Sequence, residues 1–184
     1  MKVFILQEEL TKKLAHPFNL LASFSKIFIG DEDDDANLVQ SGVDEMEEFI
    51  KIKNFGHVRK VLDLGKASLL AIKGEFNKAI DKYLEIAEGI ESIGMEIDLS
   101  IRLMKCYQEM NENDKAISFG NEILIKHPYR ATLLLGLAKA YHNDGNIDKC
   151  KELLAKTLNI WSDADEEYIY LQEAKSLWKK INKQ

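Results

Sequence analysis

Residues 134–154 read LLGLAKAYHNDGNIDKCKELL, and this stretch decides the fold. Asp144-Gly145 by itself would fit a β-hairpin turn. The apolar residues on both sides of it, however, recur every three or four positions, which is the spacing of amphipathic helices and not of strands. Gly145 is therefore expected to be the left-handed residue that ends the first helix. The stretch predicts a helix-turn-helix hairpin.

The same pattern occurs twice more upstream. At an offset of 34 residues, Tyr107 aligns with Tyr141 and Ala116 aligns with Cys150. An earlier copy aligns through Ala79, although its step to Ala116 is 37 residues. Three copies at nearly constant spacing indicate an internal repeat in which each unit is one pair of helices.

These residues resemble the tetratricopeptide repeat (TPR), a 34-residue helix-turn-helix with the pattern W-x2-L-G-x2-Y, then A-x3-F, then P. The second copy keeps Tyr107, Ala116 and Pro128, and the third keeps Tyr141, while the first copy matches least well. The resemblance covers roughly residues 60–164. It implies an all-α fold, a TPR-like α-solenoid of about three antiparallel helix pairs with N-terminal helices and a C-terminal capping helix.

The expected organisation has three parts. Residues 1–59 form an N-terminal helical region, which is either a diverged repeat or an arm used for dimerisation. The three repeats follow at 60–96, 97–130 and 131–164. Residues 165–184 form the capping helix, because a stack of repeats leaves its last apolar face open.

The net charge of −6 is concentrated in one segment. Residues 31–48 hold nine acids and no base, so the other 166 residues carry 25 basic and 22 acidic side chains. The alternating acids at 31–35 copy the start of a calcium loop, but Ala36 and Gly42 stand where that loop needs Gly and Glu. We expect a solvated linker whose last acids cap the following helix, with docking of a basic partner as the alternative. No basic stripe is present, so no nucleic-acid partner is expected.

No catalytic or metal-binding constellation stands out. The chain has four His and two Cys, and none of the histidines has a second ligand at the spacing of a metal site on a shared helix. Cys106 and Cys150 fall where the repeat packs small residues, which predicts buried, unreactive thiols. Gly-rich phosphate loops and the G-x-S-x-G motif are missing. We predict a protein that is not an enzyme and uses neither a metal nor a cofactor.

The resemblance also implies a ligand surface, because in the TPR family the first helices of successive repeats line a concave groove. Carried over by register, the peptide-binding groove consists of Leu64, Ser68, Asp98, Ile101, Lys105, Gln108, Thr132, Leu135, Lys139 and His142. Lys105 and Lys139 fall at equivalent places one repeat apart, so their ammonium groups are placed to converge on a ligand carboxylate. The alternative is that both are ordinary solvated lysines.

The leading hypothesis is a non-enzymatic scaffold or adaptor that binds a peptide or helix of a partner protein in this groove. The alternatives are a self-assembling structural or secretion-chaperone-like TPR protein, with a homodimer formed through the N-terminal helices, and a sensory or coupling domain of a larger regulator. No run of 18 apolar residues and no signal peptide is found, and two Cys do not form a disulfide framework. A cytoplasmic protein without membrane contact is therefore expected.

Overall fold

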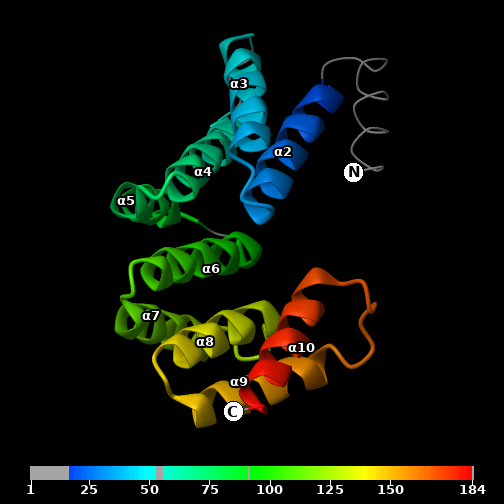
Figure 1. The fold of residues 1–184 in the computed structure, drawn as a ribbon. Coiled ribbons are helices and arrows are strands. Elements are labelled where there is room, and N and C mark those ends of the chain that lie inside the picture. Colours follow the sequence, from blue (N-terminus) through cyan, green and yellow to red (C-terminus); the bar gives the residue numbers. More distant parts are fainter. Residues whose placement is uncertain (1–16, 53–55, 91, 184) are drawn as a thin grey trace. The chain divides into compact units, whose positions relative to one another are not determined.

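The computed structural model describes residues 17–52, 56–90 and 92–183, and all regular structure within these ranges is α-helical (Figure 1). The helices are α2 (Pro17–Glu32), α3 (Ala36–Ile52), α4 (Gly56–Ile72), α5 (Phe76–Ala87), α6 (Ile93–Glu109), α7 (Asn113–Lys126), α8 (Ala131–Asn143), α9 (Ile147–Ile160) and α10 (Ile169–Ile181). The predicted all-α class is confirmed. Within the described ranges, none of these helices combines the length and the apolar content that crossing a bilayer requires.

The chain divides into two compact units, Met1–Glu88 and Gly89–Gln184. Unit 1 contains α2 to α5, and unit 2 contains α6 to α10. The division follows the second helix of the first expected repeat. Each unit is a stack of helix hairpins, in which α2 packs on α3 and α4 on α5 in unit 1, while α6 packs on α7 and α8 on α9 in unit 2.

Four hairpins share one turn geometry. Their turns contain a residue with positive φ, between 53° and 84°: Asp34, Gly74, Asn111 and Gly145. In each turn, the backbone N–H of the residue after the positive-φ residue donates a hydrogen bond to the carbonyl five positions before that N–H. These N···O distances are 2.7 to 2.9 Å, as in a Schellman motif. The turn at Gly145 was predicted from the sequence and is confirmed, and Gly74 and Asn111 hold the equivalent place in the other two repeats. The fourth, at Asp34, shows that α2 and α3 form a hairpin of the same kind without the sequence pattern of the repeat.

The four hairpins also share a fully buried position near the start of their second helix. The position five residues after the turn residue has no exposed surface in any of the four hairpins, where it is Val39, Ala79, Ala116 or Cys150. In the α2–α3 hairpin this side chain is the largest of the four, and the helix facing it has a glycine. A Cβ on Gly30 would lie 2.8 Å from Val39 Cγ2. The glycine therefore makes room for the valine, as close packing of a helix pair requires.

The acidic segment caps a helix and also pairs within unit 1. The Asp35 carboxylate accepts hydrogen bonds from the backbone N–H groups of Asn37 and Leu38, at 3.0 and 3.1 Å, at the start of α3. The predicted capping by the last acids of the run is thus confirmed. Further along α3, Glu45 forms an ion pair with Lys26 of α2. Part of the negative charge of the acidic segment is therefore compensated by an ion pair within unit 1.

Lys26 lies in a small polar network between α2 and α3. The residue is only 6% exposed. Its ammonium group contacts the Glu45 carboxylate and lies 3.3 Å from the Ser41 hydroxyl, while Ser23 donates a 3.0 Å hydrogen bond to the other Glu45 oxygen. The buried cation is thus held by hydrogen bonds as well as by charge, which is what makes burial of a charge tolerable.

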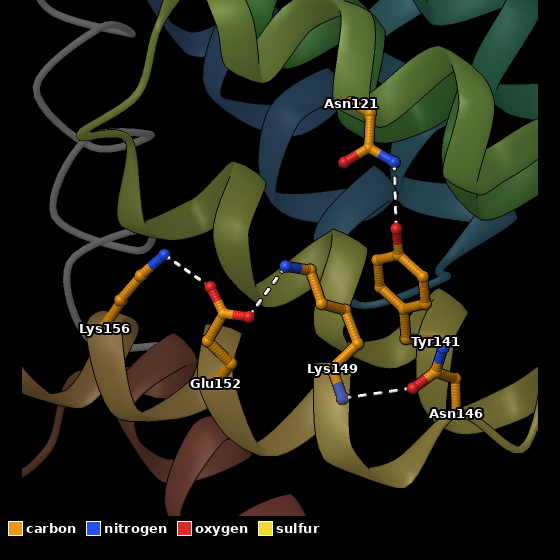
Figure 2. Close-up of polar contacts among 6 residues, drawn as sticks. All are labelled: Asn121, Tyr141, Asn146, Lys149, Glu152 and Lys156. Carbon is orange, nitrogen blue, oxygen red and sulfur yellow. Dashed lines mark hydrogen bonds and ion pairs between the residues drawn. The ribbon is translucent and has the colours of Figure 1, made fainter.

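Polar contacts in unit 2 join α7 to α8 and stabilise α9 (Figure 2). The Asn121 amide of α7 donates to the Tyr141 hydroxyl of α8 over 3.0 Å, and the Asn146 side chain caps α9 by accepting from the Lys149 N–H at 3.2 Å. Glu152 contacts Lys149 and Lys156 at 2.7 Å each, and these two hydrogen bonds lower the pKa of Glu152 to about 2. Because this cluster is solvent-exposed, it contributes at most about 1 kcal/mol.

Helix α10 packs on α8 and α9 and covers the end of unit 2, as expected of a capping helix. Its buried residues are Leu171, Ala174 and Ile181. The helix begins at Ile169, four residues later than expected, because the chain before it forms turns. In this stretch Trp161 and Tyr168 contact edge to face with ring centroids 5.3 Å apart.

Candidate functional site

Three of the ten predicted groove residues are buried. Leu64, Ser68 and Leu135 are 1%, 0% and 2% exposed. The Ser68 hydroxyl lies 3.3 Å from the Tyr83 hydroxyl within unit 1, and Leu135 belongs to the core of unit 2. A side chain without solvent-exposed surface does not contact a partner, so these three residues are removed from the candidate surface.

The other seven predicted residues retain exposed surface, and all lie on α6 and α8 of unit 2. They are Asp98, Ile101, Lys105, Gln108, Thr132, Lys139 and His142. Their location confines the candidate surface to one of the two units. The sequence alone had placed the groove across all three repeats.

Arg102, which was not predicted, follows Ile101 on α6 and pairs with another of the predicted residues. Its Nε donates to the Asp98 carboxylate over 2.9 Å, and its side chain is only 10% exposed. Burial lowers the pKa of Arg102 to about 10, and the nearby Tyr170 of α10 opposes this shift. The guanidinium is therefore still protonated at neutral pH. Its proximity to Tyr170 brings α10 to the same face as α6.

A hollow of about 410 Å³ lies between α6, α8 and α10. It is lined by one residue of α6, three of α8 and four of α10: Gln108, Lys139, His142, Asn143, Glu173, Ser176, Leu177 and Lys180. Three of the predicted groove residues, Gln108, Lys139 and His142, thus come together at one place. Lys105, Asp98, Ile101 and Thr132 do not line the hollow.

The charge of Lys139 is compensated inside the protein. Its Nζ lies 2.5 Å from Glu173 Oε2, so an ion pair joins α8 to α10 along the hollow. Both side chains are about two-fifths exposed, at 41% and 42%. The sequence had suggested that Lys105 and Lys139 converge on a ligand carboxylate. In this structure Glu173 supplies a carboxylate to Lys139, and Lys105 lies outside the hollow.

Two further contacts fix the polar groups of the hollow. The Gln108 amide donates to the Gly136 carbonyl over 3.3 Å, which ties α6 to α8. The His142 Nδ1 lies 3.4 Å from the Asn143 Oδ1. Amide groups of this kind supply both donors and acceptors, and the imidazole supplies one more polar atom. The lining is suited to recognise a polar or charged segment.

The contribution of α10 was not anticipated from the sequence. Glu173, Ser176, Leu177 and Lys180 are spaced by three or four residues and therefore share one face of a helix. This spacing was a usable signal. The helix was instead expected only to cap the stack, and Leu177 packs against the core of unit 2 as well as lining the hollow.

The cysteines do not provide reactive groups. Cys106 and Cys150 are both free and buried, as predicted. Burial raises the pKa of the Cys106 thiol to about 11, and it also raises the pKa of Cys150. Both are therefore protonated at neutral pH and are poor nucleophiles. Within the described part of the chain, no group of three His, Cys, Asp or Glu side chains is placed to hold a metal ion.

No protein-family model matches the chain. No curated protein matches it either.

Solved structures do resemble it. A kinesin light chain protein of Podosopora anserina with nearly identical TPR-like repeats matches with a TM-score of 0.59 and 17% identity, over 92% of this chain and 88% of that chain. A tetratricopeptide repeat protein from Parabacteroides merdae matches with a TM-score of 0.56 and 16% identity, over 88% and 60%. The TPR domain of P58(IPK) matches with a TM-score of 0.51 and 18% identity, over 90% of this chain and 47% of that chain. Together with the repeated turn geometry, these likenesses show that the chain has the tetratricopeptide-repeat fold.

Proposed function

We propose that this protein is a non-enzymatic interaction module that holds a segment of a partner protein in the hollow between α6, α8 and α10. One observation carries the proposal. Gln108, Lys139 and His142, which the repeat register predicts as groove residues on two different helices, line a single hollow. Register and geometry are independent arguments, and these three residues satisfy both.

The chemistry of the lining favours a peptide over a small metabolite. Small-molecule sites are mostly apolar and enclose their ligand. Here Leu177 is the single aliphatic side chain among eight lining residues, and the other seven carry amide, hydroxyl, imidazole or charged groups. Such groups can pair with the N–H and C=O groups of an extended chain, while Leu177 offers one apolar contact.

Filling the hollow tests the proposal. Ser176 is exposed and lines the hollow, so Ser176→Trp adds bulk there without removing a buried contact. We expect this variant to lose capture of partner proteins from native cell extract while keeping its far-ultraviolet circular dichroism and melting temperature. Capture is measured by affinity purification and quantitative mass spectrometry.

The matched control for this experiment is Ala155→Trp. Ala155 is exposed on α9 and is not part of the hollow. The control should capture the same partners as the native chain. Equal capture by native protein and Ser176→Trp would refute the assignment of the hollow as the partner site.

A further inference from the structure

We infer that the segment bound in the hollow is acidic, and that Lys180 and His142 receive its carboxylates in place of the lysine pair expected from the repeat register. This inference rests on the proposed function and specifies its ligand. It assigns to α10, beyond its capping role, the selection of the partner by charge.

The charges around the hollow do not cancel. Glu173 is the single acid in the lining, and Lys139 at 2.5 Å already compensates it. Lys180 makes no ion pair with any residue that the structure describes, and the same is true of its neighbours Lys179 and Lys183. The net positive charge at the end of α10 is therefore not compensated by the described part of the chain.

Lysines at the end of a helix also interact favourably with the helix dipole, and this alone would explain Lys179 and Lys183. Lys180 differs from them because it lines the hollow together with His142 of α8. The contact of His142 with Asn143 Oδ1 involves Nδ1, and Nε2 has no partner among the described residues. When both ring nitrogens carry protons, Nδ1 donates to Asn143 and Nε2 donates to a ligand. The Lys180 ammonium and the Nε2–H of this doubly protonated ring then form a pair of cationic donors from two helices, an arrangement that selects carboxylate.

The hollow also offers an apolar contact to the ligand residue that lies next to the acidic one. Leu177 lies three residues before Lys180, on the same face of α10, and is half-buried. A peptide in which acidic and apolar side chains alternate would place one on Lys180 and the other on Leu177. In a chain with a net charge of −6, such a local positive site attracts acidic segments against the general repulsion.

Two fluorescein-labelled nine-residue peptides test the inference by fluorescence anisotropy. One alternates Leu with Glu and the other alternates Leu with Gln. We expect the full chain to bind the Glu peptide at least several-fold more tightly, and the binding to weaken as salt is added. Lys180→Glu should weaken binding of the Glu peptide by about tenfold, and Lys180→Gln and His142→Gln by a few-fold each.

Lys175→Glu is the matched control, because Lys175 lies on the same helix, is exposed, and pairs with Glu166 at 2.6 Å outside the hollow. It should change binding of the Glu peptide less than twofold. The inference is wrong if the Glu peptide does not bind, if both peptides bind equally, or if Lys175→Glu weakens binding as much as Lys180→Glu. Preferential binding of a single-stranded RNA oligonucleotide would overturn it as well.

The two proposals fail in different ways. If Ser176→Trp abolishes partner capture and the Lys180 variants capture partners normally, the hollow is the partner site but its ligand is not selected by acidic charge. If Ser176→Trp captures partners as the native chain does, the hollow itself is not the site.

Discussion

Gly120→Val is expected to lower the free energy of unfolding of unit 2 by about 1–3 kcal/mol. Gly120 lies on α7, at the point where this helix passes α6 and α8. A Cβ at this position would lie 2.7 Å from Leu137 Cδ2 and 2.8 Å from Met104 Sδ. Both of those side chains have no exposed surface, so neither has space to move into. The added methyl groups must push the helices apart.

Gly120 also occupies a defined place in the repeat. It stands four residues after Ala116, where the TPR pattern A-x3-F has its large residue. The equivalent residue is Tyr83 in the first repeat and Leu154 in the third, and both are buried. In the second repeat, Met104 and Leu137 from the flanking helices reach the place that the large side chain would take. The effect of the substitution therefore measures how tightly the two repeats of unit 2 are packed.

The control for this prediction is Gly94→Val in α6. A Cβ at Gly94 would meet only the Ser92 hydroxyl oxygen, at 3.9 Å, so the same substitution has room there. It should change stability by less than about 1 kcal/mol. Urea denaturation followed by circular dichroism gives the overall loss, and hydrogen exchange shows which helices lose protection. Equal effects at the two positions would contradict the packing described for α6, α7 and α8.

Glu45→Gln is expected to lower the free energy of unfolding of unit 1 by about 1–3 kcal/mol. The substitution removes the Glu45 carboxylate from the Lys26 ammonium group, in a residue that is only 6% exposed. Loss of an ion pair in such a place is costly because little water can replace the carboxylate. Glu45 is 44% exposed, which lets some water in and places the expected loss below that of a fully buried pair.

Two variants separate this effect from a general loss of charge. Glu47→Gln breaks the neighbouring pair with Lys66, whose side chains are 39% and 40% exposed, and should cost less than about 1 kcal/mol. Lys26→Met in the Glu45→Gln background removes the buried cation and should recover most of the loss. Urea denaturation of the three variants provides the comparison. If the double variant is no more stable than Glu45→Gln alone, the buried charge is not the cause.

The fold could be predicted from the sequence because the turns that define it have chemical signatures. Gly74, Asn111 and Gly145 all tolerate positive φ, and each is followed after five residues by a small buried side chain. The turn at Asp34 lacked both signals. It lies within a run of acids that reads as a solvated linker, and the side chain five residues later is the larger Val39. The compensation for that valine, at Gly30, becomes visible only when the two helices are seen in contact.

The candidate site could be predicted in part, because a repeat register gives the direction in which a side chain points but not how wide an arc of the helix is buried. Leu133, Leu134 and Leu135 are consecutive residues of α8, and all three are buried. A helix packed by neighbours on several sides thus buries positions that the register assigns to the groove. Gln108 and His142 lie near the C-terminal ends of α6 and α8, Lys139 lies about one turn before the end of α8, and all three keep exposed surface. The role of α10 depends on tertiary packing and has no signature in the repeat pattern.

Site-specific photocrosslinking tests the central claim most directly. A photoreactive p-benzoylphenylalanine replaces Ser176 in the hollow in one protein and Ala155 on the outer face of α9 in another, and both proteins are irradiated in native cell extract. If the hollow holds a partner segment, position 176 should yield a discrete crosslinked protein, position 155 should not, and the crosslinked peptide should be acidic. Crosslinks that are equal at both positions, or that occur only at 155, would contradict this assignment of the binding surface.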